Sequence, residues 1–198
     1  MNIKILGTRG EIKPSSPYHA KKSGILIDNE ILLDIGEEVF LKQNPKCILL
    51  THLHPDHAFF VRTPRRIIKD INAPIYAPQS YNGNIDVKKL ISTKKFDNHI
   101  ITPIPTHHSL KVASQAYLIK KGKESILYTG DLVWLDKKYH HKLKNVALVI
   151  TEASYYRKGG LIKRDRMSGK IYGHTGIPDL LQLFSKFTKR VLFVHFGS

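Results

Sequence analysis

Cysteine and long apolar runs are scarce in this sequence of 198 residues. Its single cysteine, Cys47, excludes an intramolecular disulfide and fits a reducing compartment. Because Cys47 lies in an apolar stretch, we expect it to be a small core residue. No apolar run approaches the roughly 20 residues that a transmembrane helix needs, and residues 1–6 are too short for the apolar region of a signal peptide. We therefore expect a cytoplasmic protein without a membrane partner.

Acidic residues are also few. Sixteen Asp and Glu stand against 32 Lys and Arg, which gives a formal net charge of +16 and a sequence pI near 9.9. A field of this sign attracts polyanions and speeds their encounter, so we expect nucleic acid or another phosphate-rich substrate as the partner. The alternatives are a charge that serves solubility alone, or a thermophile's Lys-rich surface. Thermophiles usually enrich Glu together with Lys, and here acids are scarce.

The chain has no internal repeat, low-complexity tract or linker, and its length suits one domain, residues 1–198, with a real core. Apolar periodicity predicts strands at residues 3–6, 24–27, 30–34, 46–51, 73–76, 100–104, 115–120, 125–128, 147–151 and 190–194. We expect one hairpin between the strands at 24–27 and 30–34, joined by Asp28-Asn29, and another between the strands at 115–120 and 125–128, around Lys121-Gly122-Lys123. It predicts helices at 86–92 and 177–186, with Ile177, Leu180, Leu181 and Phe184 on one face, and a partly helical segment at 57–70. Two packed sheets with helices outside them, an α/β (α+β) fold, would account for this order.

The most informative segment is residues 51–57, Thr-His-Leu-His-Pro-Asp-His. It follows an apolar run that is typical of a buried strand. A strand directs His52 and His54 to the same side, and a turn after Pro55 brings Asp56 and His57 to a second side. This arrangement suits two neighbouring metal ions. Imidazole and carboxylate ligands favour zinc, with iron or manganese as alternatives.

His-x-His-x-Asp-His after a hydrophobic strand resembles the motif of the metallo-β-lactamase superfamily. The alternative is a histidine-rich surface loop. The resemblance implies an αββα sandwich as a single domain, with two divalent metal ions at one edge of the sheets. It also implies a homodimer.

The same resemblance implies further ligands at later strand ends. The third histidine should follow the strand at 100–104, where we choose His108 and keep His107 as the alternative. Neighbouring residues of an extended chain point opposite ways, so only one of the two should bind metal. Residues 125–131 end in Thr-Gly-Asp, which resembles the family's bridging-aspartate motif, with Gly130 turning Asp131 inward. His195 ends the last strand and would close the second metal site.

The ligand assignment that the resemblance implies has three parts. The first metal would take His52, His54 and His108, the second metal would take Asp56, His57 and His195, and Asp131 would bridge the two.

Two further motifs resemble tRNase Z, the tRNA 3′-processing endonuclease. Residues 148–155 resemble its strand ending in Glu-Ala-Thr-Phe, and residues 173–176 resemble its Gly-His-Ser-Thr stretch. The resemblance implies that Glu152 orients His174 and that His174 donates a proton to the leaving oxygen. We count Asp56 with these two as catalytic. The alternatives are a surface salt bridge for Glu152 and a place near a helix N-cap for His174.

The sequence differs from tRNase Z in the segments that hold the substrate in that family. The family's long tRNA-gripping arm and its Pro-x-Lys-x-Arg-Asn loop have no counterpart here. A loop-like, basic stretch between Glu152 and His174 could instead clamp phosphates, or could simply be solvated. Its cations are Arg157, Lys158, Lys163, Arg164, Arg166 and Lys170, and its aromatic residues are Tyr155, Tyr156 and Tyr172, which could stack on bases.

The sequence therefore predicts a metal-dependent phosphodiesterase or nuclease acting on RNA or a nucleotide. One alternative is a hydrolase of a lactone, thioester or other small ester, as many members of the superfamily are. A second alternative is a non-catalytic nucleic-acid-binding module.

Overall fold

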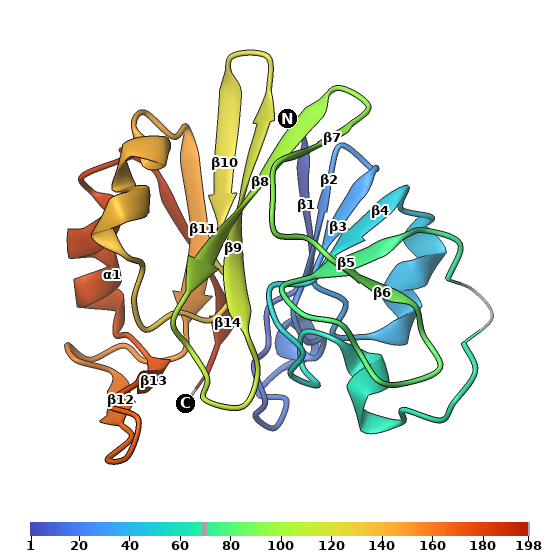
Figure 1. Ribbon diagram of the computed structural model, residues 1–198, viewed down its shortest axis with the longest axis horizontal. Coiled ribbons are helices and arrows are strands. Elements are labelled where there is room, and N and C mark those ends of the chain that lie inside the picture. Colours follow the sequence, from blue (N-terminus) through green and yellow to red (C-terminus); the bar gives the residue numbers. More distant parts are fainter. Residues whose placement is uncertain (69–70, 198) are drawn as a thin grey trace. The chain divides into compact units, whose positions relative to one another are not determined.

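The computed structural model describes residues 1–68 and 71–197 (Figure 1). By internal contacts the chain forms two compact units, Met1–Ile91 and Ser92–Ser198. The single domain expected over 1–198 stays a prediction. Within the described residues, no helix is both long and apolar enough to span a membrane.

The first unit is built on one mixed sheet in which the six strands lie in chain order. The strands are β1 (Ile3–Gly7), β2 (Gly24–Ile27), β3 (Ile31–Leu33), β4 (Cys47–Leu49), β5 (Ile75–Ala77) and β6 (Val87–Lys89). The described part of this unit also has three 3-10 helices, which are η1 (Pro17–His19), η2 (Glu38–Gln43) and η3 (Phe59–Arg62). Strands β1 to β3 pair antiparallel, and β3 to β6 pair parallel.

The β2–β3 hairpin forms where the sequence predicts it. Asp28 and Asn29 have φ angles of 51° and 57°, and the amide of Glu30 donates to the carbonyl of Ile27. Two left-handed residues in this position make the turn that matches the twist of a hairpin. Asp and Asn are the residues, after Gly, that tolerate this backbone conformation best.

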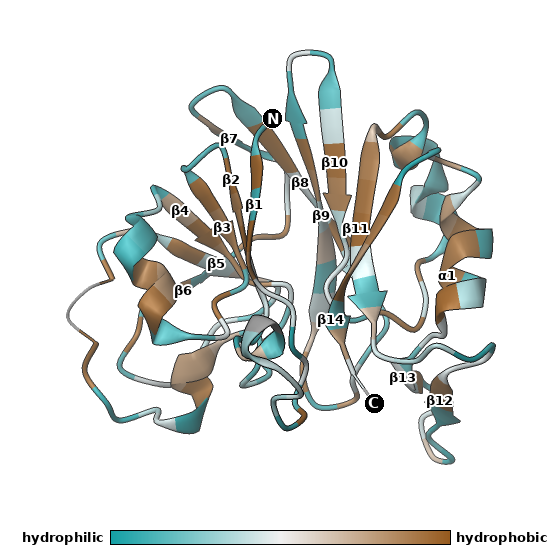
Figure 2. Ribbon diagram, turned by 180° about the vertical axis from the view of Figure 1, so that it is seen from behind, coloured by the Kyte–Doolittle hydropathy of each residue, from teal (hydrophilic) through white to brown (hydrophobic). Residues whose placement is uncertain are grey.

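The centre of this sheet is buried on both faces. Every residue of β2, β3 and β4 is buried, including Cys47, which confirms its expected place in the core. Side chains of successive strand residues point to opposite faces, so both faces must be covered. Figure 2 shows these strands as continuous apolar ribbons. The helix η2 contributes Phe40 and Leu41 to the buried set.

The helix predicted at 86–92 is wrong, because β6 occupies this segment. Val87 is buried, Lys88 and Lys89 are exposed, and the strand pairs parallel with β5. So short a run cannot separate helical from strand periodicity, and the partner strand decides. In the segment predicted as partly helical at 57–70, η3 is present, and residues 69–70 lie outside the described residues.

The second unit holds a second mixed sheet of six strands, in the order β14-β11-β10-β9-β8-β7 (Figure 1). Its strands are β7 (Lys94–Phe96), β8 (His99–Thr106), β9 (Ser114–Lys121), β10 (Glu124–Tyr128), β11 (Leu148–Ala153) and β14 (Val191–Phe196). The helices are η4 (Lys137–Leu143) and α1 (Ile177–Phe184). The predicted β9–β10 hairpin is confirmed, with Gly122 at a φ of 56° in its turn.

The helix α1 packs into an apolar cluster with residues of β8 to β11. Leu180, Leu183 and Phe184 are its buried residues, whereas Leu181 is 44% exposed, so the prediction that Leu181 shares the buried face is wrong. At 100° per residue, Leu183 lies beside Leu180 on the core side and Leu181 falls at the edge of the stripe. Burying each such side chain contributes about 1.5–3 kcal/mol.

The basic stretch after Glu152 was predicted to be loop-like, which is wrong for its centre. Strands β12 (Leu161–Arg164) and β13 (Ile171–His174) pair there as an antiparallel hairpin. Every residue of β12 is exposed, so the apolar alternation that reveals a half-buried strand is missing from the sequence.

Candidate metal centre

The four candidate ligands of the first unit follow β4 directly. Nε2 of His52 lies 3.0 Å from Nδ1 of His54, and Nε2 of His57 lies 3.9 Å from Oδ2 of Asp56. His52 and His57 are fully buried, and Asp56 is 5% exposed. The residues therefore fall into two close pairs, one of two imidazoles and one of an imidazole with a carboxylate.

A buried carboxylate that the sequence reading missed, Asp34, positions these ligands. Its Oδ2 lies 2.7 Å from Nδ1 of His57, and its Oδ1 accepts a hydrogen bond of 2.7 Å from the amide of Thr51. A carboxylate can only accept from an imidazole N–H here, so Nδ1 of His57 carries the proton and Nε2 keeps its lone pair. Carboxylate partners of this kind fix metal-binding histidines in proteins.

Through the hydroxyl of Thr51, Asp34 also determines which ring nitrogen of His52 carries the proton. It lies 3.1 and 3.0 Å from the two oxygens of Asp34 and 3.0 Å from Nδ1 of His52. Because the hydroxyl donates its proton to the carboxylate, it accepts from Nδ1 of His52. The lone pair of His52 is then on Nε2, the atom that faces His54.

A signal for Asp34 was present in the sequence: it ends an apolar strand and precedes Ile-Gly, much as the other candidates end strands.

In the second unit, Asp131 lies between two histidines. Its Oδ2 is 3.5 Å from Nε2 of His108, and its Oδ1 is 3.2 Å from Nε2 of His195. All three side chains are almost completely buried. Gly130 has a φ of 59°, as expected for the turn that directs Asp131. A carboxylate whose two oxygens face different imidazoles has the form of a bridging ligand.

His108 and His107 lie in different surroundings. Nδ1 of His108 donates to the carbonyl of Gly173 at 2.9 Å, which leaves Nε2 as the lone-pair atom facing Asp131. Burial lowers the pKa of the His108 imidazole, although the charge of Asp131 opposes this, and a neutral ring is the form that binds metal. His107 is instead partly exposed, and its Nε2 lies 3.0 Å from Asp136.

A bulge in β14 directs His195 to its place. In the parallel pairing with β11, Glu152 faces Val194 and Ala153 faces Phe196, so His195 is the extra residue. Its φ is 54°, a left-handed conformation that is uncommon for residues other than glycine, although histidine adopts it more often than most. Bulges re-aim side chains and occur often beside functional sites.

Glu152, which is buried, and His174, which is half-buried, form a hydrogen-bonded pair beside Asp131. Nδ1 of His174 lies 2.6 Å from Oε2 of Glu152, and the amide of Leu132 donates to Oε1 at 2.5 Å. Ligand-type atoms of Asp131, Glu152 and His174 all lie within 4.8 Å of one another. Burial and the charge of Asp131 raise the pKa of Glu152, and the hydrogen bond with His174 opposes that rise.

Three of the four donor pairs described above have separations that fit one metal ion, and the fourth, Asp56–His57, is wider at 3.9 Å. Two nitrogen or oxygen ligands about 2.0–2.1 Å from one tetrahedral zinc ion lie about 3.3 Å apart. The pairs His52–His54, His108–Asp131 and His195–Asp131 have separations of 3.0, 3.5 and 3.2 Å. All seven predicted ligands belong to groups of histidine and carboxylate atoms that could hold a metal ion. The chain thus carries buried His and Asp clusters consistent with a binuclear site.

Comparison with known proteins gives the family context. A family model described as the β-lactamase superfamily domain matches residues 39–196, and no curated protein matches the sequence. Among solved structures, the metallo-β-lactamase fold protein YhfI from Bacillus subtilis is 18% identical with a TM-score of 0.70, over 98% of this chain and 86% of that chain. The short form of human tRNase Z is 17% identical with a TM-score of 0.67, over 100% of this chain and 93% of that chain.

A diphosphatase from the PhnP family is 14% identical with a TM-score of 0.66, over 98% of this chain and 85% of that chain. At these identities the likeness concerns the fold alone. It confirms the expected metallo-β-lactamase fold with two mixed sheets.

Proposed function

Because this chain belongs to the metallo-β-lactamase superfamily, we propose that it is a metal-dependent phosphodiesterase that cleaves RNA or another nucleic-acid phosphodiester. The observation that carries the proposal is the Glu152–His174 pair beside Asp131. A pair of this kind delivers a proton, and phosphodiester cleavage needs one because its leaving group is a poorly stable alkoxide.

The proposed ligands are the seven residues introduced above. His52, His54 and His108 would hold one divalent ion, Asp56, His57 and His195 would hold the other, and Asp131 would bridge them. Two ions held there would supply a nucleophile from water at neutral pH and would neutralise charge on the phosphoryl oxygens. Zinc is favoured by the donor set, with iron or manganese as alternatives.

In the proposed mechanism, His174 acts on the leaving oxygen. Its Nδ1 is held by Glu152, so Nε2 is the atom that donates the proton as the phosphorus–oxygen bond breaks. Glu152 keeps both carboxylate oxygens engaged, one by His174 and one by the amide of Leu132. It therefore fixes the ring direction and stabilises the imidazolium that precedes proton transfer.

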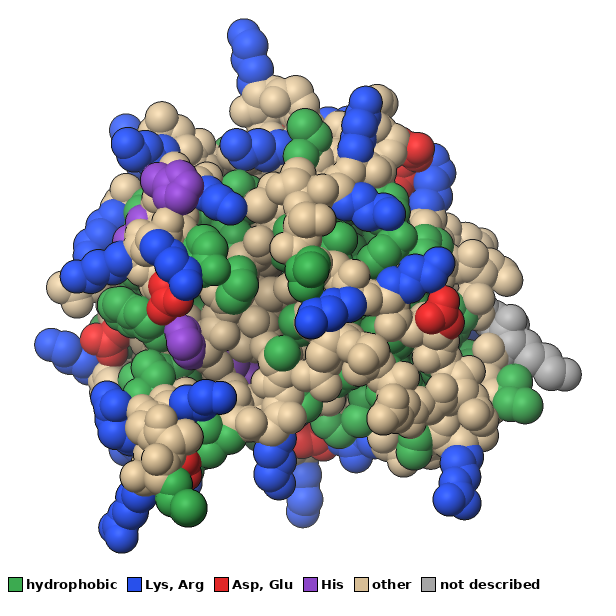
Figure 3. Space-filling view, viewed as in Figure 1, with side chains coloured by type: hydrophobic (Ala, Val, Ile, Leu, Met, Phe, Trp, Pro, Cys, Tyr) green, Lys and Arg blue, Asp and Glu red, His purple; other side chains and the backbone are tan. Residues whose placement is uncertain are grey.

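The charge of the protein supports a polyanionic substrate. The net charge is +16, and Lys and Arg side chains are spread over the visible surface in Figure 3, with few acidic side chains between them. Neutralising the phosphates of a polynucleotide releases condensed counterions, which strengthens binding at low salt. A hydrolase of small neutral esters gains nothing from such a charge. Two of the similar structures are described as a tRNase and a diphosphatase, but the proposal rests on the residues of this chain.

The test is a substrate panel with the metal-loaded protein. We expect turnover of bis(p-nitrophenyl) phosphate and of RNA, little turnover of a lactone or a thioester, and an affinity for RNA that falls steeply as salt rises. Preferred turnover of the lactone or thioester would contradict the proposal and favour the small-ester hydrolase. Binding of RNA without turnover of any substrate would indicate the non-catalytic module.

A further inference from the structure

The β12–β13 hairpin joins the candidate active site to an exposed, basic surface. Its pairing is regular, with Leu161 opposite His174 and Lys163 opposite Tyr172. Residues directly opposite in an antiparallel pair project to the same face, as do residues two apart in one strand. One face of the hairpin therefore carries His174, Tyr172 and Lys163 together, and the other face carries Ile162 and Arg164.

The base of the hairpin is fixed to the candidate ligands. The amide of Gly173 donates to the carbonyl of His108 at 2.8 Å, and Nδ1 of His108 donates back to the carbonyl of Gly173. Gly173 has a φ of 118°, and a Cβ there would lie 2.0 Å from the carbonyl oxygen of Leu161, so only glycine permits this approach. The direction of the hairpin face is thus tied to the position of His108.

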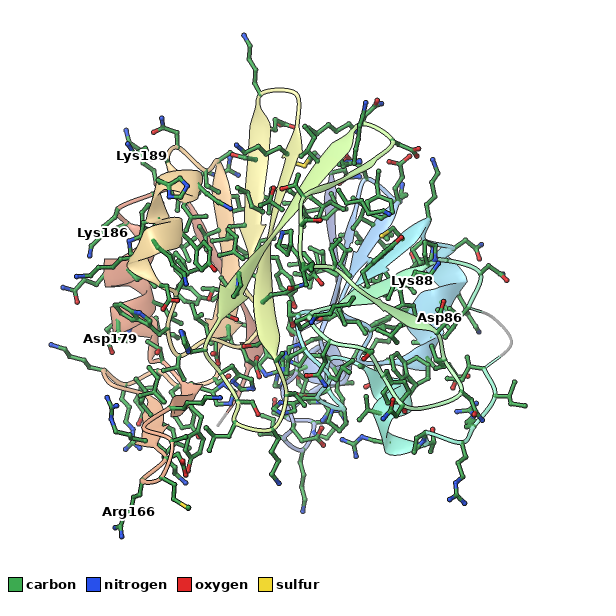
Figure 4. All side chains as sticks on the ribbon, in the orientation of Figure 1. Asp86, Lys88, Arg166, Asp179, Lys186 and Lys189 are labelled. Atoms are coloured by element: carbon green, nitrogen blue, oxygen red, sulfur yellow. The ribbon has the colours of Figure 1, made fainter. Side chains whose placement is uncertain are left out.

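The tip of the hairpin is also ordered. Oδ1 of Asp165 accepts hydrogen bonds from the amide and hydroxyl of Ser168 at 2.7 and 2.6 Å, and Arg164 donates to the carbonyl of Gly169. Arg166 extends from this tip, away from the sheet of the second unit (Figure 4). Lys163 and Arg166 are exposed, so their charges are available to a partner.

We propose that this face of β12–β13 binds the nucleotides on the leaving-group side of a single-stranded polynucleotide, with Tyr172 stacking on a base and Lys163 pairing with a phosphate. The proposal rests on the proposed phosphodiesterase function, because it is His174 that locates the leaving oxygen at the foot of this face. Positions two apart in a strand are about 6.7 Å apart, so Tyr172 comes next after His174 along the face. Stacking on an aromatic side chain requires an unstacked base, which favours a single strand over a duplex.

RNA-binding measurements on variants test the stacking by Tyr172 and the phosphate pairing by Lys163 separately. Affinity for a short, fluorescein-labelled, phosphorothioate-linked RNA is measured by fluorescence anisotropy over a salt series, with the metal-loaded protein. We expect Lys163→Ala to weaken binding and to reduce the slope of log affinity against log salt by about 0.7, the value for one phosphate contact on a single strand. Tyr172→Ala should weaken binding by roughly 5- to 160-fold with the slope unchanged.

Conservative and matched variants complete the design. Lys163→Arg and Tyr172→Phe should bind as the unaltered protein does. Lys123→Ala removes one exposed cation from the β9–β10 turn, at the end of the second unit away from the hairpin (Figures 1 and 2), and should leave affinity and slope unchanged. Lys163→Ala and Tyr172→Ala should keep the metal content and the circular dichroism spectrum of the unaltered protein. Lys123→Ala should also turn over bis(p-nitrophenyl) phosphate at the unaltered rate, because Lys123 lies between β9 and β10 and not on the hairpin.

The failure of this proposal can be told from the failure of the proposed function. If Lys163→Ala and Tyr172→Ala match Lys123→Ala while RNA is still cleaved, the hairpin surface is refuted and the phosphodiesterase stands. If Lys163→Ala and Tyr172→Ala lose metal or change the circular dichroism spectrum, the hairpin is a structural support and the proposal is overturned. If no phosphodiester is cleaved but the binding pattern appears, the hairpin surface stands as an RNA-binding site.

Discussion

Nδ1 of His174 lies 2.6 Å from a carboxylate oxygen of Glu152, although the two residues are 22 positions apart in the sequence. Glu152 is buried at the end of β11, whereas His174 is 24% exposed in its side chain and ends β13. The pair therefore has one member fixed in the protein interior and one member at the surface. This geometry supports the proposed role of His174 as an oriented proton donor.

Replacement of His174 by alanine should abolish most turnover and leave the metal content intact. General acid catalysis contributes about 10²–10⁴-fold, so the rate with RNA should fall within this range. Glu152→Gln should lose less, because the amide can still accept from the ring. With a p-nitrophenolate leaving group the loss should shrink, since that group needs little protonation.

The control for this prediction is His141→Ala, which removes an exposed histidine of η4. Metal analysis and steady-state rates for both variants are the measurements. Loss of metal from His174→Ala would identify His174 as a metal ligand. Unchanged RNA cleavage by this variant would show that His174 does not donate the proton to the leaving oxygen.

Asp131→Ala should lower the metal content from about two ions per chain toward one or fewer, because each carboxylate oxygen faces a different histidine. Asp136→Ala removes a partly exposed carboxylate from the same segment and should leave the content unchanged. Elemental analysis of both purified proteins makes the comparison. Full occupancy in Asp131→Ala would rule out a bridging role.

His108→Ala should reduce metal content sharply, and His107→Ala should not. His108 is buried with Nε2 toward Asp131, whereas His107 is partly exposed and pairs with Asp136. Elemental analysis again provides the readout, with circular dichroism to show that both variants fold. Equal, mild effects would mean that neither histidine binds metal.

Asp34→Asn should weaken zinc affinity by about 10- to 100-fold, because the amide no longer orients His57 and Thr51 as the carboxylate does. A matched control is Asp97→Asn. Asp97 is exposed and has a φ of 46°, close to the 55° of Asp34, so the same substitution is made in the same backbone conformation. Zinc titration against a competing chelator measures the difference. An affinity equal in the two variants would exclude the orienting role of Asp34.

The features that depend on local spacing can be predicted from the amino-acid sequence alone. Short apolar runs indicated β2, β3, β9 and β10, and the Asp28–Asn29 pair indicated a turn, because these signals lie within a few residues of one another. The spacing of residues 51–57 likewise predicted four candidate ligands. The order of motifs along the chain then indicated the superfamily, which the family model matches over residues 39–196.

The contacts and elements that depend on strand pairing are seen only in the three-dimensional structure. Asp34 meets His57 across 23 positions, and Gly173 meets His108 across 65 positions, so no local pattern reports either contact. The bulge that directs His195 exists only in the register between β11 and β14. Strand β6 and the β12–β13 hairpin carry too little apolar alternation to be read from the sequence. These segments are strands because their backbone groups form hydrogen bonds with a partner strand. Almost every residue type carries those backbone groups, so the pattern of side chains does not reveal the pairing.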